Sequence, residues 1–184
     1  MTAPVHVMVD LETLGTGPDA AIVSIGVCAF DPQSDTVGRS KMWAVDIAGP
    51  ETGVVDPATV LWWLRQSQQA VKDSFFSGPR VPIREAVNNL CHWLSSCQLS
   101  GDVVLWSRGP TFDETILRAT AARLGIGFPV KFYNSRCVRT ILDAAKSIGF
   151  AERKNPGVAH SALDDAIHQA FEVQRAYRWM RDRA

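Results

Sequence analysis

The sequence lacks an excess of charge of either sign. Its 184 residues include 19 Lys and Arg against 19 Asp and Glu, so the formal net charge is +0. Proteins that coat long nucleic acids by releasing counterions are normally more basic than this. A neutral chain can still bind a short nucleic-acid end locally, or through metal ions that carry their own charge. The composition therefore argues against broad coating of nucleic acid and leaves local recognition open.

Features of secreted and membrane proteins are also missing. No apolar run approaches the roughly 18 residues that suggest a membrane span. The N-terminus has no basic region followed by the apolar stretch of a signal peptide. We therefore expect a cytoplasmic protein with no membrane partner. The four cysteines form no CxxC pair and have no zinc-ligand spacing, so we expect most of them to be small buried hydrophobic residues.

The length and the 46% apolar content predict one domain, residues 1–184, with a sizeable core. Strand patterns occur at residues 5–11, 21–30, 41–47, 102–107 and 130–135. Helical patterns occur at residues 58–67, 83–96, 111–124, 136–148 and 161–180, the first after the N-cap pair Asp56-Pro57 and the third capped by Thr111. Residues 71–82 and 152–157 are expected to be loops. Three strands followed by helix–strand alternation predict a mixed α/β sheet with helices on its faces.

Two carboxylates, Asp10 and Glu12, occur in the first predicted strand. Residues two apart in a strand point to the same face, at a spacing of about 6–7 Å. Gly15 and Gly17 end the strand just beyond this pair. Two like charges resist burial unless something positive or aqueous faces them. Arginine or lysine partners, water at the strand end and divalent metal ions all satisfy this requirement.

Three further residues can also be explained either by local structure or by a functional site. Asp113 falls in the first turn of a helix after a buried strand, where any acid is stabilised by about 0.3–1 kcal/mol. His160 and Asp165 are five residues apart in "HSALDDAIHQA". Taken alone, that stretch is also typical of helix-start acids, Asp164 and Asp165, beside an exposed histidine.

Together these residues resemble the DEDDh family of 3′→5′ exonucleases, which includes the proofreading subunit of the bacterial replicative polymerase, oligoribonuclease and RNase T. The matching motifs are "MVDLETLG" with Asp10 and Glu12, "TFDETIL" with Asp113, and "HSALDDA" with His160 and Asp165. They follow the family's order and span most of the chain. The segments "GPDAAIVSIG" and "VLWWLRQS" resemble the exonuclease VIII-like and mycobacterial exoribonuclease branch. The resemblance implies an RNase H-like fold: a mixed central β-sheet of about five strands flanked by helices.

The resemblance also implies a mechanism. Asp10, Glu12, Asp113 and Asp165 would hold two divalent metal ions, Mg²⁺ or Mn²⁺, with Asp10 bridging them. His160 would be the general base for the attacking water, since imidazole changes charge near neutral pH. No tyrosine lies near the position that a second branch of the family uses instead. The expected activity is hydrolysis of phosphodiester bonds at a single-stranded 3′ end of RNA or DNA, releasing nucleoside 5′-monophosphates.

Four candidates for binding the terminal nucleotide accompany this resemblance. Family members hold the 3′ nucleotide with residues just after the first motif, which implies Thr13 for the terminal hydroxyl and Leu14 as a wedge against the base. Trp62 and Trp63 point to neighbouring faces of a helix. Either both belong to the core, or one exposed indole stacks on the terminal base.

Polar residues farther along the chain are candidates for phosphate or substrate contacts. Arg136 and Arg139 in "SRCVRT" either meet phosphates or are solvated surface residues. Ser107 and Arg108 precede Asp113 and line its approach.

Two other classes of function use the same fold. A non-catalytic nucleic-acid-binding module would need the tryptophans but not the complete set of acids and histidine. A scaffold or interaction protein would need neither. Family members are commonly dimers, and a neutral surface with tryptophans permits a homodimer.

Overall fold

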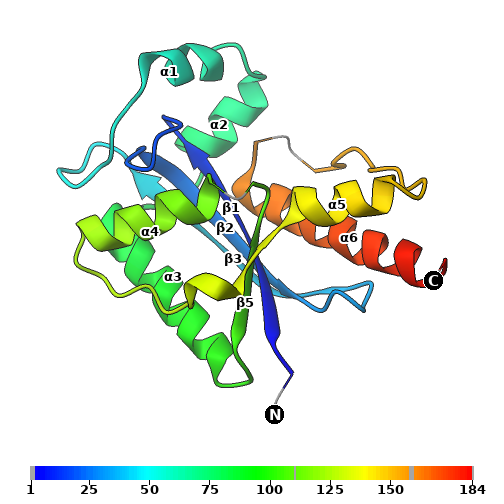
Figure 1. The fold of residues 1–184 in the computed structure, drawn as a ribbon. Helices are drawn as coiled ribbons and strands as arrows, with labels where there is room; N and C mark the ends of the chain where they lie inside the picture. Colours follow the sequence, from blue (N-terminus) through cyan, green and yellow to red (C-terminus); the bar gives the residue numbers. More distant parts are fainter. Residues whose placement is uncertain (1–2, 110, 158–159, 184) are drawn as a thin grey trace.

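The computed structural model describes residues 3–109, 111–157 and 160–183. Within these residues a six-stranded sheet has the order β4-β3-β2-β1-β5-β6 (Figure 1). Its strands are β1 (Val5–Thr13), β2 (Ile22–Phe30), β3 (Val37–Asp46), β4 (Arg80–Pro82), β5 (Val103–Ser107) and β6 (Ser135–Cys137). β1, β2 and β3 are antiparallel neighbours, whereas β4, β5 and β6 pair in parallel. The predicted mixed α/β sheet is confirmed, with one more strand than expected.

Helices cover both faces and one end of this sheet. They are α1 (Pro57–Trp63), α2 (Gln68–Phe76), α3 (Ile83–Gln98), α4 (Asp113–Arg123), α5 (Val138–Lys146) and α6 (Ala162–Arg181). Figure 1 shows α3 and α4 on one side of the sheet, α5 and α6 on the other, and α1 with α2 beyond its end. In the described part of the chain, no helix is long and apolar enough to cross a membrane.

Three local predictions are wrong. Residues 71–82, expected to be a loop, contain most of α2 and all of β4. The helix was hidden because few of its residues are buried, and its start depends on the Ser67 side chain, which accepts a hydrogen bond from the Ala70 N–H. Within residues 130–135, expected to be a strand, Phe132–Asn134 form a 3₁₀ turn and only Ser135 belongs to a strand, β6. α4 begins after Phe112 without a side-chain cap from Thr111.

The strand period of β1 separates its apolar and acidic residues. Val7, Val9 and Leu11 belong to the core cluster shared with α3 and α4. Met8, two residues before Asp10, belongs to the cluster shared with α5 and α6. The carboxylate of Asp10 accepts a hydrogen bond from α6. The two carboxylates of β1 therefore lie on the face that α6 covers, beyond the apolar part of that face.

Gly26 allows α6 to reach the carboxylates. It is paired with Asp10 across the β1–β2 ladder. A Cβ atom at Gly26 would lie 2.2 Å from the carbonyl carbon of Ala162 and 2.4 Å from the backbone nitrogen of Leu163. Because no side chain fits in that space, the first turn of α6 rests directly on β2. This contact brings the start of α6 over the acidic end of β1.

We predict that Gly26→Ala lifts the first turn of α6 from the sheet. The overpacking should lower the free energy of unfolding by about 1–3 kcal/mol and should weaken any thermal stabilisation by Mn²⁺. Thermal unfolding with and without Mn²⁺ measures both effects. Gly127→Ala is the matched control, since a Cβ at Gly127 meets nothing within 4 Å. An alanine at position 26 that leaves both readouts unchanged would contradict the importance of this contact.

Candidate active site

A cavity of about 320 Å³ lies where β1 ends between α4 and α6. The residues predicted from the three motifs all line it: Asp10, Glu12, Asp113, His160 and Asp165. β1 contributes the first two and the first turn of α4 the third. His160 lies in the turn just before α6, and Asp165 lies in the first turn of that helix. Tertiary structure thus brings together acids from three separate elements.

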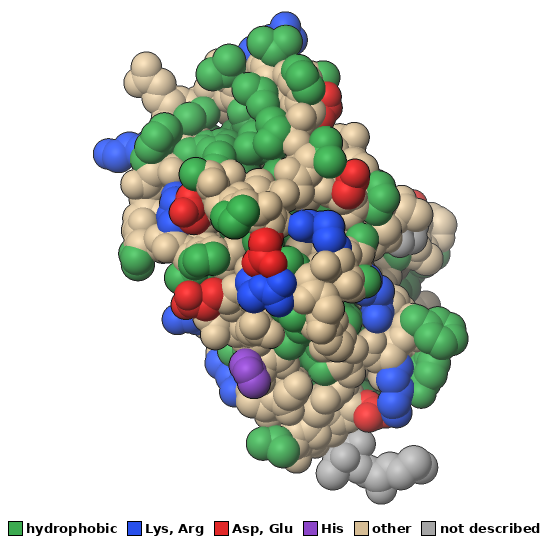
Figure 2. All heavy atoms as spheres, turned by 90° about the vertical axis from the view of Figure 1, so that its left-hand side faces the viewer, with side chains coloured by type: hydrophobic (Ala, Val, Ile, Leu, Met, Phe, Trp, Pro, Cys, Tyr) green, Lys and Arg blue, Asp and Glu red, His purple; other side chains and the backbone are tan. Residues whose placement is uncertain are grey.

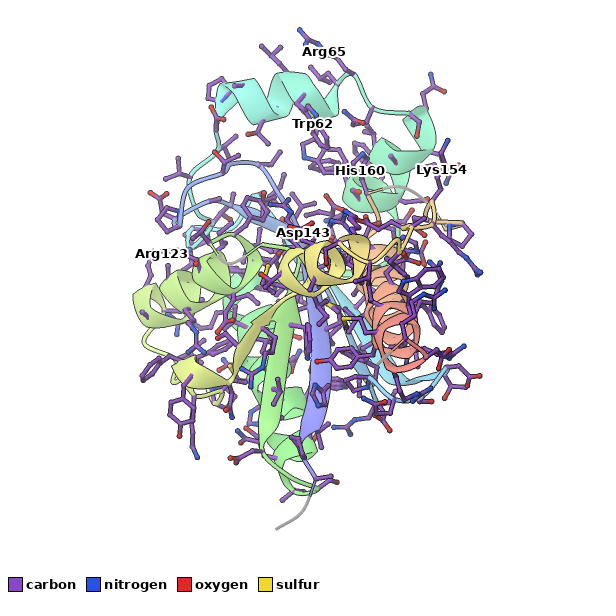
Figure 3. All side chains as sticks on the ribbon, turned by 45° about the vertical axis from the view of Figure 1, so that its right-hand side comes forward. Trp62, Arg65, Arg123, Asp143, Lys154 and His160 are labelled. Atoms are coloured by element: carbon purple, nitrogen blue, oxygen red, sulfur yellow. The ribbon has the colours of Figure 1, made fainter. Side chains whose placement is uncertain are left out.

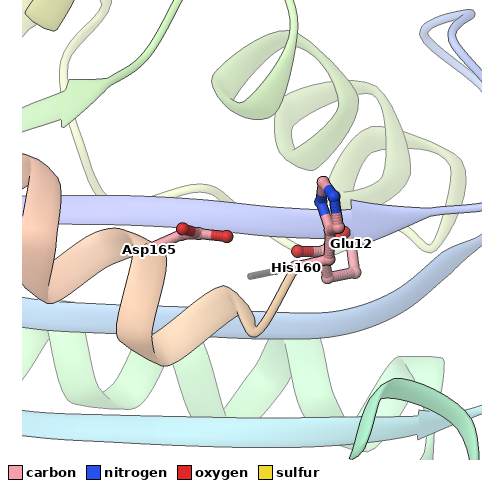
Figure 4. Close-up of side chains that lie close together, drawn as sticks. All are labelled: Glu12, His160 and Asp165. Carbon is pink, nitrogen blue, oxygen red and sulfur yellow. The ribbon is translucent and has the colours of Figure 1, made fainter. Parts of the chain in front are cut away.

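Two of these acids lie especially close to the histidine. Glu12, His160 and Asp165 each offer a ligand atom, and these atoms lie within 4.8 Å of one another (Figure 4). Carboxylate oxygen and imidazole nitrogen are common ligands of divalent metals. Asp10 and Asp113 lie in the same cavity but outside this tighter group. The cavity therefore has donor atoms of the kind that a divalent cation requires.

Neutral groups hold the acids in place. The Leu11 backbone N–H donates to Asp113 Oδ1 at 3.1 Å and thereby ties the start of α4 to β1. Gln169 Nε2 donates to Asp10 Oδ1 at 2.7 Å. Asn155 Nδ2 donates to Asp165 Oδ1 at 2.6 Å. Across residues 3–109, 111–157 and 160–183, no lysine or arginine forms an ion pair with any of the four acids. Their charge is thus left for another cation to balance.

Burial raises the pKa values of all four acids, and repulsion from neighbouring carboxylates adds to this for Asp10 and Glu12. Burial is the largest cause for Glu12, and the charges of Asp165 and Asp113 add to it, so that its pKa rises to about 8. Burial raises the pKa of Asp113 to about 6. Burial also raises the pKa of Asp10 and of Asp165, and for Asp10 the three neighbouring carboxylates contribute. A bound cation would favour the ionised forms and release protons.

His160 is held by the helices beyond the end of the sheet. Its φ of +63° lies in the left-handed region, which a residue with a side chain keeps only when its surroundings hold it there. The Ser74 hydroxyl on α2 donates to the His160 carbonyl oxygen at 2.8 Å. The imidazole meets the indole of Trp62 edge to face, with 4.9 Å between ring centroids. α1 and α2 therefore position the histidine over the acids (Figure 3).

A second cavity, of about 450 Å³, adjoins the acid cavity and shares Glu12 and Phe112 with it. Thr13, Trp62 and Trp63 also line it. Exposed apolar side chains, including those of Leu61 and Leu64, surround the α1 end of the molecule. Figure 2 shows apolar side chains gathered around a hollow there. This cavity is suited to a flat apolar group beside the acids.

The two tryptophans differ in exposure. Trp63 is buried, and its indole Nε1 donates to the Thr13 carbonyl oxygen at 2.9 Å. Trp62 is 43% exposed. Trp63 therefore belongs to the core, and Trp62 is accessible. Trp62 is the one whose indole a ligand can reach.

Not every candidate residue reaches these cavities. Arg108 and Arg139 line the acid cavity. Ser107 is buried, and its hydroxyl donates to the Gly109 carbonyl oxygen at 3.0 Å. Leu14 is buried in a small cluster with Trp63 rather than in either cavity. The Arg136 guanidinium donates to the carbonyl oxygens of neighbouring residues. Ser107 and Leu14 are thus enclosed by the fold, and Arg136 is an exposed residue that does not line the acid cavity.

Residues that sequence reasoning missed are the ones that support the acids. The sequence does contain a signal for Gln169: it follows Asp165 by four residues and so lies one helical turn farther along the same face. Asn155 and Ser74 had none, since each approaches its partner from a distant loop or helix. Phe112, which lines both cavities, was hidden just before a helix start.

Residues 5–177 match the family model of the 3′-5′ exoribonuclease Rv2179c-like domain. The exodeoxyribonuclease of Enterobacteria phage T4 is 26% identical to the chain, over 74% of this chain and 70% of that protein. The match to the family model spans all three motifs.

Solved structures of nucleases share the fold. One is the nuclease domain of 3′hExo, a DEDDh family member bound to rAMP, with a TM-score of 0.61 and 13% identity. The match covers 97% of this chain and 92% of the 3′hExo chain. E. coli exonuclease I in complex with a dT13 oligonucleotide has a TM-score of 0.62 and 12% identity over 94% of this chain. The chain spans only 40% of exonuclease I and 64% of cell-death related nuclease 4. At these identities the likeness establishes the RNase H-like fold.

The raised carboxyl pKa values predict how stability depends on pH without metal. The pKa of Glu12 is about 8 in the folded protein, against an ordinary 4.5. Between these values the folded state binds more protons than the unfolded state, so the free energy of unfolding falls as the pH rises. Glu12→Gln should remove part of this fall and raise Tm at pH 8 in a chelating buffer. Mn²⁺ should stabilise the unchanged protein more at pH 8 than at pH 6.

Thermal unfolding between pH 5 and pH 8.5, with chelator or with Mn²⁺, tests this prediction. The readout is the difference between the variant and the unchanged protein. This difference cancels the contribution of half-buried His6, whose lowered pKa makes stability rise with pH near its ordinary value of 6.5. Glu85→Gln, an exposed change on α3, is the control. A stability that does not fall toward pH 8 would mean that the acids ionise freely without a cation.

Proposed function

Because the chain belongs to the family of 3′-5′ exoribonuclease Rv2179c-like domains, we propose that its acid cavity uses two divalent metal ions to remove nucleoside 5′-monophosphates from single-stranded 3′ ends. Family membership makes the protein a nuclease hydrolase with 3′-5′ exonuclease activity. The observation that carries the proposal is the convergence of Asp10, Glu12, Asp113 and Asp165 in one cavity without an ion-pair partner among the described residues.

The four carboxylates fit Mg²⁺ or Mn²⁺, since hard cations prefer oxygen ligands. Asp10 would be one of the residues that hold these ions, and the charges of the three other acids all act on its carboxyl group. Two such ions, when bound, stabilise the attacking and leaving oxygens of a phosphodiester displacement. Gln169, Asn155 and the Leu11 N–H orient three of the acids for this task. Such supporting contacts commonly matter nearly as much as the ligands themselves.

His160 is the candidate general base. Imidazole accepts a proton near neutral pH, and the ligand atoms of His160 and Glu12 lie within 4.8 Å of each other. A water molecule beside the acids would be within reach of the imidazole. Ser74 keeps the backbone of this residue in place, so the ring approaches the acids from the side of α1 and α2. His160 would thus remove the proton from the attacking water.

The second cavity would hold the terminal nucleotide. Trp62 offers an exposed indole on which a base can stack, and Thr13 lies beside it. Arg108 and Arg139 lie on the acid cavity, where they can face a phosphate. The choice between RNA and DNA depends on a contact to the 2′-hydroxyl. Relatives that act on each are similar to this chain: an exoribonuclease family and a phage exodeoxyribonuclease.

We predict that Asp10→Asn abolishes nucleotide release in Mg²⁺ or Mn²⁺ while the protein stays folded. His160→Ala should reduce turnover by about 10²–10⁴-fold and should leave the Mn²⁺-dependent rise in Tm largely intact. Nucleotide release from single-stranded oligomers measures the first effect, and thermal unfolding the second. His92→Ala, an exposed histidine on α3, is the matched control.

A panel of matched RNA and DNA oligomers, single-stranded and duplex, labelled at the 5′ end, tests the direction and the substrate. The expected pattern is a ladder shortened from the 3′ end, with monophosphates as product. Tight binding without release in any metal would instead favour a non-catalytic module. Neither binding nor release would favour a scaffold.

A further inference from the structure

A groove of about 660 Å³ continues from the acid cavity along the outer face of α6. His168 lines both hollows. Asn155 lines the groove and donates to Asp165 in the acid cavity. On the opposite side, the acid cavity joins the cavity of Trp62 through Glu12. Three adjoining hollows therefore form one path, with the acids in the middle.

Several cations line this groove. Arg153 and Lys154, on the loop before α6, and Arg178, near the end of the helix, are all exposed. No acid forms an ion pair with their side chains in the described part of the chain. Figure 3 shows Lys154 on the loop that leads to His160. The distance along α6 from His168 to Arg178 is about 15 Å, which is longer than one phosphate needs.

The acids of the groove do not cancel this charge. Glu172 is only 1% exposed, and its carboxylate is paired with the Arg175 guanidinium. Asp35 and Asp164 also line the groove, so the three exposed cations outnumber these two carboxylates. Phe171, which is 38% exposed, adds an aromatic surface between the ends of the groove. Cations beside an aromatic side chain are typical of surfaces that bind single-stranded nucleic acid.

We propose that this groove binds the phosphates of the substrate strand upstream of the bond that is cut. The inference rests on the proposed function of the acid cavity and goes beyond it. With the terminal base at Trp62 and its phosphate at the acids, the rest of the strand leaves the acid cavity past His168. Arg153, Lys154 and Arg178 then contact the following phosphates. The chain thereby binds a strand of several nucleotides through a local set of cations, despite its net charge of +0.

The double variant Lys154→Glu/Arg178→Glu tests the groove. Its dissociation constant for a 5′-labelled single-stranded 12-mer, measured by fluorescence anisotropy, should rise at least about tenfold at 0.1 M salt. The slope of log affinity against log salt should become shallower by about 0.7 for each phosphate that the variant no longer neutralises. The rate constant kcat/KM for the 12-mer should fall in parallel. Hydrolysis of the p-nitrophenyl ester of a nucleoside 5′-monophosphate should be unchanged, since this ester occupies only the other two hollows.

Lys41→Glu/Lys131→Glu is the matched control. It alters the net charge by the same amount at exposed residues away from α6, because Lys41 lies beside α3 and Lys131 lies near Asp102 at the start of β5. Thermal unfolding verifies that both double variants are folded. Equal effects of the two double variants, or an equal decrease in activity on the 12-mer and the ester, would overturn the groove proposal. A protein that hydrolyses neither substrate refutes the catalytic proposal, while the anisotropy measurement still decides for or against the groove.

Discussion

Repulsion between carboxylates that share one partly buried cavity is the constraint on which the rest of the site depends. Four acids meet at the end of β1; burial raises the pKa values of all four, and the charges of the neighbouring carboxylates raise those of Asp10 and Glu12 further. Such a cluster is unfavourable unless the fold imposes it, since buried charges without partners cost several kcal/mol. Neutral donors from Gln169, Asn155 and Leu11 fix the positions of three acids without neutralising them. The fold thus keeps four acids together without an ion pair to lysine or arginine among the described residues.

The acids lie on regular secondary structure, whereas the histidine lies in a turn. β1 and the first turns of α4 and α6 carry the acids, and the backbone contact at Gly26 sets the distance between strand and helix. His160 instead sits in a turn with a left-handed backbone and is held by Ser74 and by the edge of Trp62. Removing the contact at Gly26 would disturb the acids, whereas a change at Ser74 would reach the histidine alone. The acids and the histidine are therefore supported by separate parts of the structure.

The three adjoining hollows would allow a chain with no excess charge to bind a polyanion, as the proposed function requires. The Trp62 cavity offers apolar surface, the acid cavity offers ligands for cations, and the α6 groove offers cations of its own. In the proposed function, each part would hold a different portion of one strand: a base, the phosphate that is cut, and the phosphates that follow. Because these surfaces are small and separate, they have little effect on the net charge of the chain.

Local patterns were enough to predict much of this protein. The alternation of β1 placed Asp10 and Glu12 on one face, the three motifs named the residues of the acid cavity, and the element order predicted a mixed α/β sheet. α2 escaped prediction because it buries few residues. Leu14, Ser107 and Arg136 do not line either cavity, because neighbours in sequence can face the core, the backbone or solvent. The roles of Gly26, Asn155, Ser74 and the α6 groove arise only from contacts between segments far apart in the chain. Spacing along a strand or helix is a local property and can be read from letters, whereas the distance between two elements depends on how the whole core closes around them.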